Sequence, residues 1–167
     1  MTSSESNDEG AGTGIDVRTA RGRDWPSVRQ FNVFLENRIG ALMNLVRRFE
    51  ATDNRIVSIS VVDSADCAII RLVLSDPERA REVFEFAHLP ITESDLLVVQ
   101  LPDTKQPLAQ ICKALLAAEI NIHYAYPLML GPMQSAALAL HVEDHETAVQ
   151  TLEQQGFTVL SEADIRE

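Results

Sequence analysis

Residues 31–49, FNVFLENRIGALMNLVRRF, match residues 97–115, LVVQLPDTKQPLAQICKAL, at a displacement of 66 positions (97 − 31 = 66). The displacement needs no gap, and it places apolar residues of the first stretch on apolar residues of the second. Similarity at one fixed period is typical of a structural repeat. The sequence of 167 residues therefore predicts two copies of one small domain.

Each of these stretches begins with a strand pattern and continues with a helix pattern. Apolar residues first alternate, which is the period of a strand with one buried face. The alternating residues are Phe31, Val33 and Leu35 in the first copy and Leu97, Val99 and Leu101 in the second. Apolar residues then follow the i, i+3, i+4, i+7 spacing of an amphipathic helix. They are Leu42, Leu45, Val46 and Phe49, matched by Leu108, Ile111, Cys112 and Leu115.

The repeat continues through two further strands, a second helix and a final strand. Strand positions Ile56, Ile70, Leu72 and Leu74 match Ile122, Ala136, Leu138 and Leu140. A helix is predicted from Pro77 to Ala87, because Asp76 can cap it and proline suits its first turn. Val83 and Phe86 should face inward, and the matching helix should run from about Asp144 to Gln155. With last strands near Ile91 and Phe157, each copy is predicted to be βαββαβ.

Helices that follow the first and third strands of such a sheet pack on one face, as in ferredoxin-like folds. We therefore predict an α+β protein of two ferredoxin-like domains, residues 27–94 and 95–167, each an antiparallel four-stranded sheet with helices on one face. A copy of this size has a marginal core, and Phe34, Leu96 and Val98 add apolar surface to the open faces. The two copies should therefore pair rigidly. Residues 1–26, rich in Gly, Ser and acids, are predicted to be a disordered tail.

Composition excludes several classes of protein. A net charge of −11 without a cluster of Lys and Arg argues against binding to nucleic acid. No apolar run approaches the roughly 18 residues that cross a bilayer, and the first 14 residues lack a signal-peptide core, so we expect a cytoplasmic protein. Cys67 and Cys112 have no metal or redox spacing and are expected to be buried thiols. His141 and His145 straddle a strand end and a helix start, so neither a metal nor another cofactor is expected.

The segment from Glu36 to Leu42, ENRIGAL, carries the binding chemistry that the sequence predicts. Gly40 removes a Cβ at the mouth of the helix, where free N–H groups and the positive dipole end can receive a carboxylate. An amino acid supplies such a carboxylate. The plainer alternatives are that Gly40 only makes a tight turn and that Asn37 only caps the helix.

This segment resembles the signature of the ACT domain family, in which Asn or Asp, a basic residue, Pro, Gly and a small residue precede an apolar helix. Ile39 stands where the family has proline, and the resemblance extends from Val28 to Ile165. In the family this loop and a second strand of a neighbouring domain commonly enclose an amino acid. The resemblance therefore implies a ligand-binding set of Asn37, Arg38, Ile39, Gly40 and Ala41, with Ser58 and Ser60 as weaker candidates.

The second copy departs from the signature. Gln106 occupies the position of Gly40, and Pro107 has no N–H to offer, so this helix mouth should receive an anion less well. Asp103 could bind an ammonium group. A secondary site would comprise Asp103, Thr104, Gln106, Asn121 and His123, although the alternation of His123, Tyr124 and Tyr126 favours a structural role for that strand.

No nucleophile–base pair, carboxylate pair or metal cluster has recognisable spacing, so the sequence favours a protein that is not an enzyme. We expect a small-molecule ligand, most simply an amino acid, with a second copy of the chain or a separate enzyme as partner. One alternative is a regulatory small subunit of a biosynthetic enzyme such as acetolactate synthase, whose second half differs in kind. The other is an interaction module without a ligand.

Overall fold

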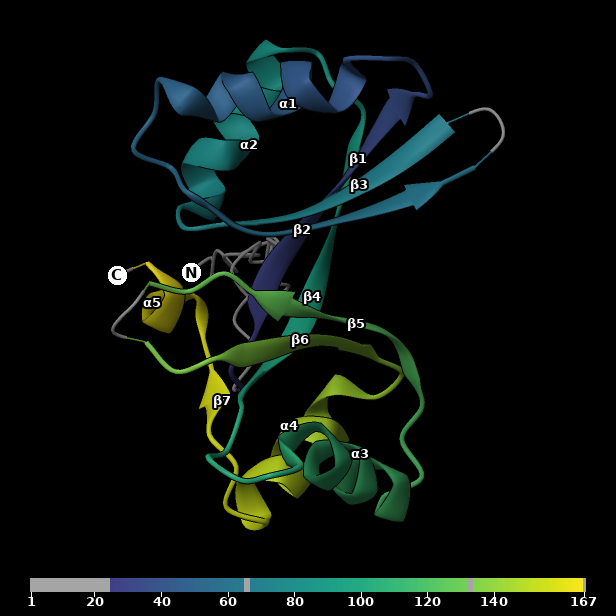
Figure 1. Cartoon of the computed structure of the whole chain (residues 1–167), viewed down its shortest axis with the longest axis vertical. Coiled ribbons are helices and arrows are strands. Elements are labelled where there is room, and N and C mark those ends of the chain that lie inside the picture. Colours follow the sequence, from purple (N-terminus) through teal and green to yellow (C-terminus); the bar gives the residue numbers. More distant parts are fainter. Residues whose placement is uncertain (1–24, 65–66, 132–133, 167) are drawn as a thin grey trace, which may run out of the picture.

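A computed structural model describes residues 25–64, 67–131 and 134–166 (Figure 1). The order of helices and strands follows the predicted repeat, and the chain has an α+β fold. The elements are β1 (Val28–Glu36), α1 (Ala41–Glu50), β2 (Ile56–Asp63), β3 (Cys67–Leu74), α2 (Pro77–Phe86), β4 (Ile91–Gln100), α3 (Pro107–Ala117), β5 (Ile122–Leu128), β6 (Ala137–Val142), α4 (His145–Gln154), β7 (Val159–Leu160) and α5 (Glu162–Ile165).

Strand β4 serves both halves of the chain. Its first part, Ile91–Leu96, pairs with β1, and its second part, Leu97–Gln100, pairs with β6. The described residues therefore form one antiparallel seven-stranded sheet of order β2-β3-β1-β4-β6-β5, with β7 beside β4, in place of two separate four-stranded sheets. The sequence ITESDLLVVQ of β4 contains no glycine or proline that would end the first copy's last strand before the second copy begins.

The sheet curls so that its two edge strands meet. Helices α1 and α2 lie at one end of the molecule and α3 and α4 at the other, with the strands between them (Figure 1). At the meeting edges the Met129 amide donates to the Val57 carbonyl at 2.7 Å, and the Ser58 hydroxyl donates to the Pro127 carbonyl at 2.7 Å. Both edges thereby satisfy backbone groups that an open edge would expose to other chains.

Three apolar clusters make up the core. One lies beneath α1 and α2, one beneath α3 and α4, and the third lies between the helix-free faces of the two halves. The third includes Leu96 and Val98, both fully buried, so the expected pairing of the copies covers this surface. Phe34 is only partly buried and does not belong to that cluster.

Several helix positions differ from the prediction. On α2, Ala80 and Phe84 are buried, whereas Phe86 is 88% exposed, so its inward assignment is wrong. The first turns of α1 and α3 extend beyond the core, and Leu42 and Leu108 are exposed. The expectation of buried thiols is also wrong, because Cys112 is exposed and Cys67 is partly exposed.

The predicted tail of residues 1–26 lies outside the described residues except for Trp25 and Pro26. Trp25 packs against the cluster beneath α3 and α4, and the Pro26 carbonyl lies 3.0 Å from Nε2 of His145. The folded structure therefore includes Trp25 and Pro26, which the prediction placed in the tail.

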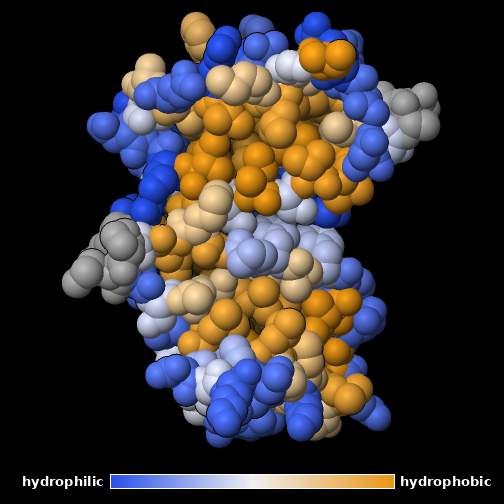
Figure 2. Space-filling model, in the orientation of Figure 1, coloured by the Kyte–Doolittle hydropathy of each residue, from blue (hydrophilic) through white to orange (hydrophobic). Residues whose placement is uncertain are grey.

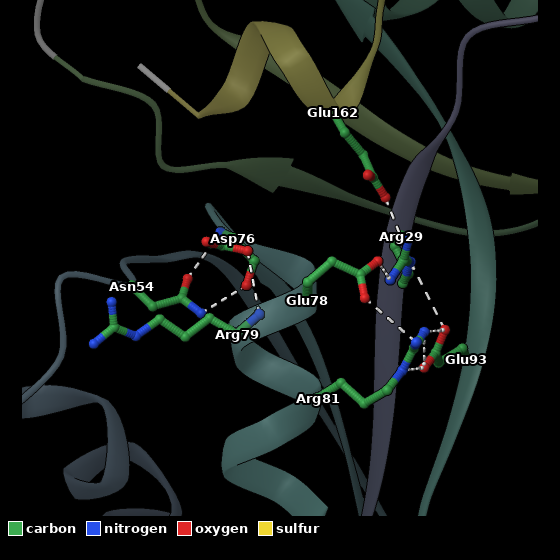
Figure 3. A network of polar contacts seen from close by, with 8 residues as sticks. All are labelled: Arg29, Asn54, Asp76, Glu78, Arg79, Arg81, Glu93 and Glu162. Carbon is green, nitrogen blue, oxygen red and sulfur yellow. Dashed lines mark hydrogen bonds and ion pairs between the residues drawn. The ribbon is translucent and has the colours of Figure 1, made fainter.

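A network of ion pairs joins the C-terminal helix α5 to the first half (Figure 3). Arg29 on β1 contacts Glu78 of α2 at 2.8 Å, Glu93 of β4 at 3.7 Å and Glu162 of α5 at 3.5 Å. Arg81 of α2 binds Glu93 at 2.7 Å. The network adds a polar link between the halves beside their shared apolar cluster.

Candidate functional site

Gly40 sets the conformation of the loop before α1. Its φ of 85° lies in the left-handed region, which favours glycine, and α1 begins at the next residue without a side-chain cap. The tight-turn role of Gly40 is therefore confirmed. A Cβ at Gly40 would meet no heavy atom within 4 Å, so the space beside Gly40 is open among the described residues.

Asn37 and Arg38 make the polar side-chain contacts of the loop that precedes the Gly40 turn. The Asn37 amide donates to Oδ1 of Asp63 at 2.7 Å and to the Ser64 carbonyl at 3.4 Å. Asn37 thus fixes the loop to the end of the β2–β3 hairpin, and the alternative that it caps α1 is wrong. Arg38 forms an exposed ion pair with Glu36 at 3.3 Å.

A cleft of about 370 Å³ opens beside this loop. Pockets for small ligands usually measure about 300–1,000 Å³, so the cleft is large enough for an amino acid. It includes Arg38 and Ala41 from the predicted loop, whereas Asn37, Ile39 and Gly40 do not line it, and Ile39 is fully exposed. The lining residues are Phe34, Leu35, Glu36, Arg38, Ala41, Asn44, Leu45, Arg48, Leu89 and Pro90.

Eight of the ten lining residues lie outside the predicted ligand-binding set, and four of the eight show why. Asn44 and Arg48 lie four and eight positions after Gly40, and this helical spacing could have placed them on the same face. Leu89 and Pro90 reach the cleft because the Phe34 amide donates to the Pro90 carbonyl at 3.1 Å. No local pattern indicates that contact, since it joins the end of β1 to the residues before β4.

The cleft combines both kinds of charge that an amino acid requires. Within the described residues Arg48 has no ion-pair partner, so its guanidinium is available to a carboxylate. Guanidinium groups bind carboxylates through paired, charge-assisted hydrogen bonds. Glu36 can accept from an ammonium group, and Leu45, Leu89 and Pro90 supply apolar surface.

Ser58 does not contribute to this cleft. Its side chain is 2% exposed, and its hydroxyl donates to the Pro127 carbonyl where the sheet edges meet. Ser58 therefore links the halves and is not part of the candidate site. Ser60, the other weaker candidate, is partly buried on the same strand and also does not line the cleft.

The structure does not gather the secondary site of the second copy into a cavity. Of five cavities in the described part of the chain, none includes any residue of this secondary site. All of them are exposed, and Gln106 precedes α3 without a side-chain cap. The set comprises Asp103, Thr104, Gln106, Asn121 and His123.

Two larger cavities, of about 550 and 660 Å³, lie beside Trp25. Both are lined by Glu93 and Asp95, and the first also by Arg29, whose guanidinium is held by Glu78, Glu93 and Glu162. None of the predicted site residues lines them. The smaller cleft at α1 is therefore the candidate site for an amino acid.

The tyrosines of β5 have the structural role that the sequence favoured. Gln30 is fully buried; its amide donates to the hydroxyl of Tyr124 at 2.8 Å and of Ser94 at 2.9 Å. The Tyr126 hydroxyl donates to the Gln30 carbonyl, and Arg71 lies 4.0 Å from the centre of the Tyr124 ring. These bonds satisfy polar groups between the two halves.

His141 borders this cluster and makes stability depend on pH. Burial lowers the pKa of His141 below its ordinary value of 6.5, and His123 and Arg71 lower it further. The unfolded chain consequently binds more protons as pH falls below 6.5, and folding stability falls with it.

We expect urea unfolding between pH 8 and 5 to show this loss of stability, and His141→Gln to reduce the slope of unfolding free energy against pH. An unchanged slope would contradict the assignment, and His88→Asn, which alters an exposed imidazole elsewhere, is the control.

Two further features of residues 25–64, 67–131 and 134–166 bear on function. No helix there combines the length and apolar character needed to cross a membrane. In that same part of the chain, no group of three or more His, Cys, Asp or Glu side chains is arranged to hold a metal ion.

The fold defines the class of paired α+β domains, here two halves that share strand β4. The family model for the ACT domain pair matches residues 26–167. The chain therefore belongs to the ACT domain pair family. The regulatory domains of this kind are generally not catalytic.

Solved structures share this fold. Protein BT0572 from Bacteroides thetaiotaomicron superposes with a TM-score of 0.76 at 20% identity, over 84% of this chain and 96% of that chain. The ligand-free regulatory subunit of aspartate kinase from Thermus thermophilus gives 0.52 at 13% identity, over 78% of this chain and 93% of that chain. At these identities the likeness concerns the fold alone. A search of curated proteins finds no match.

Proposed function

We propose that this protein is a non-catalytic regulatory protein that binds an amino acid in the cleft at the start of α1. Its units are the two ferredoxin-like halves, residues 27–94 and 95–167, which share β4. The observation that carries the proposal is the cleft itself, where the first residue of α1, Ala41, lies with the carboxylate of Glu36 and with the guanidinium of Arg48, which has no ion-pair partner among the described residues.

The three parts of an amino acid each have a complementary surface in this cleft. The carboxylate binds Arg48 and the positive end of α1, with Arg38 beside them. The ammonium group binds Glu36. An apolar side chain packs against Leu89 and Pro90, so the proposed ligand class is amino acids with an apolar side chain.

The regulated activity lies in a separate protein. The likeness to a regulatory subunit of aspartate kinase supports this arrangement, because that protein is named as the regulatory partner of an enzyme. A biosynthetic enzyme is thus the kind of partner that we propose, in the cytoplasm. Retention of such an enzyme by the immobilised chain, altered by an apolar amino acid, would support it.

A thermal-shift screen of free amino acids tests ligand binding. A ligand that binds only the folded state stabilises it by about 2.7 kcal/mol at 100 times its Kd. We expect an apolar amino acid to raise the melting temperature and an acidic one to have little effect. If no amino acid changes the melting temperature, ligand binding is contradicted.

Matched variants locate the site. Gly40 does not line the cleft but directly precedes Ala41, which does, so Gly40→Leu should abolish the shift by displacing the first turn of α1. Gly156→Leu, at the same left-handed backbone with φ 84° and equally open surroundings but away from the cleft, should retain it. A side chain at such a φ costs about 1–2 kcal/mol at either position, so the comparison isolates binding from strain. Arg48→Gln should also lose the shift, and its exposed neighbour variant Arg47→Gln should keep it. Binding that survives both Gly40→Leu and Arg48→Gln would place the ligand elsewhere.

A further inference from the structure

Helix α3 carries exposed apolar residues beside its core-facing side. The core-facing side packs through Ile111, Ala114 and Leu115. A row of residues four apart runs along the edge of that side and comprises Leu108, Cys112 and Leu116, named here the α3 stripe, in which Leu108 is 52% and Leu116 75% exposed. The sequence of α3 holds one charged residue, Lys113, so the apolar surface of this helix is wider than the core covers.

The complete stripe is present in the second copy, while its last position is charged in the first. By the displacement of 66, Leu116 corresponds to Glu50 of α1, which is exposed and charged. Figure 2 shows apolar surface over the region of α3 and β5, on the same face as apolar surface of the first half. An uncovered apolar face of this kind usually marks an interaction site.

We propose that α3 of a second copy of this chain covers the α3 stripe, antiparallel to the first, with the two-fold axis at Cys112. A two-fold interface requires a surface that complements itself. Leu108 and Leu116 lie four residues before and after Cys112, so an antiparallel copy places each Leu108 on the Leu116 of its partner. Ridges of residues four apart are also those that most often interdigitate between helices.

Charges at the two ends of the stripe fit the same axis. Lys105 lies seven residues before Cys112 and Glu119 seven residues after it, and both are exposed. Neither has an ion-pair partner within the described residues. Antiparallel helices bring the Lys105 of each copy to the Glu119 of the other, while a parallel pair would oppose like charges. Such exposed pairs add little affinity, so they select the direction and the leucines supply the association.

A second copy fits the stripe better than an unrelated protein does. The net charge of −11 makes copies repel over most of their surface. The stripe itself carries no charge, and the residues beyond its two ends, Lys105 and Glu119, have opposite charges. The pattern is symmetric about Cys112 in both the leucine and the charge positions. Only a partner with the same symmetric pattern uses both ends at once.

Sedimentation of the full chain tests the dimer. The wild type should have about twice the 18.5 kDa mass of one chain at micromolar concentration. Leu116→Glu should weaken association by about 100-fold or more, because it buries an unpaired charge at the centre of an interface. Leu42→Glu, at the equivalent of Leu108 in the first copy, and Phe86→Glu on α2 should leave the dimer intact, and circular dichroism checks folding.

Cross-linking tests the position of the axis. Mild oxidation should produce a disulfide-linked dimer in the wild type and in Cys67→Ser, but not in Cys112→Ser or Leu116→Glu. Lys105→Glu should weaken the dimer, and adding Glu119→Lys should restore it. A monomeric wild type, a dimer that survives Leu116→Glu, or a link through Cys67 would overturn the proposal. Ligand binding is measured separately, so a dimer without amino-acid binding would contradict only the proposed function.

Discussion

Phe84→Ala is expected to lower the free energy of unfolding by about 3–5 kcal/mol, the range for removing a large aromatic side chain from a core. Phe84 is fully buried at the centre of the cluster beneath α1 and α2. Its ring lies 5.1 Å from that of Phe31 and 5.4 Å from that of Phe49, measured between centroids. The substitution therefore removes the contact between α2, α1 and β1. Urea unfolding followed by circular dichroism measures the loss.

Phe86→Ala is the matched control for this prediction. Phe86 has the same side chain on the same helix, two residues later, and is 88% exposed. Exposed substitutions usually change stability by no more than about 0.5 kcal/mol. Equal losses from the two alanine variants would contradict the observed orientation of α2.

Gln30→Leu is expected to lower the free energy of unfolding by about 2–4 kcal/mol, because each buried polar group left unpaired costs about 1–3 kcal/mol. Gln30 is fully buried between the halves, and it accepts from the Tyr126 hydroxyl and donates to the Tyr124 hydroxyl. Burial raises the pKa of Tyr126, so its hydroxyl stays protonated and must find an acceptor. Leucine offers none.

A double-mutant cycle tests this explanation. In Gln30→Leu with Tyr126→Phe, the unpaired hydroxyl is gone, so the double variant should lose less stability than the sum of the single variants. Strict additivity would show that the two residues do not act as a pair.

Fluorescence of Trp25, the single tryptophan, reports the second half, while circular dichroism reports both halves. Because β4 is shared, the two signals should change in one common transition.

A small part of the candidate site was open to prediction from the sequence. The positive φ of Gly40 and the start of α1 depend on neighbouring residues, and of the predicted loop Arg38 and Ala41 line the cleft. Leu89 and Pro90 were beyond prediction, because they arrive through pairing between distant segments. Ser58 was predicted to contact the ligand, and its strand was predicted correctly. Its hydroxyl instead donates to the Pro127 carbonyl, a long-range contact that no local pattern indicates.

The sequence by itself determined the elements of this protein. The period of 66 and the periods of helix and strand are local patterns, and so are the caps at Asp76 and Asp144, whose side chains accept from the third residue of each helix. Helix α4 consequently occupies almost the predicted range.

Only the tertiary structure decided how the two copies join. The pattern of β4 predicts buried strand residues but not that one strand pairs with β1 at one end and β6 at the other. Likewise, periodicity marks one apolar face of a helix, whereas exposure depends on where the opposing sheet ends, which separates Phe84 from Phe86. Both outcomes follow from contacts between residues distant in the chain, and such contacts leave no period in the sequence.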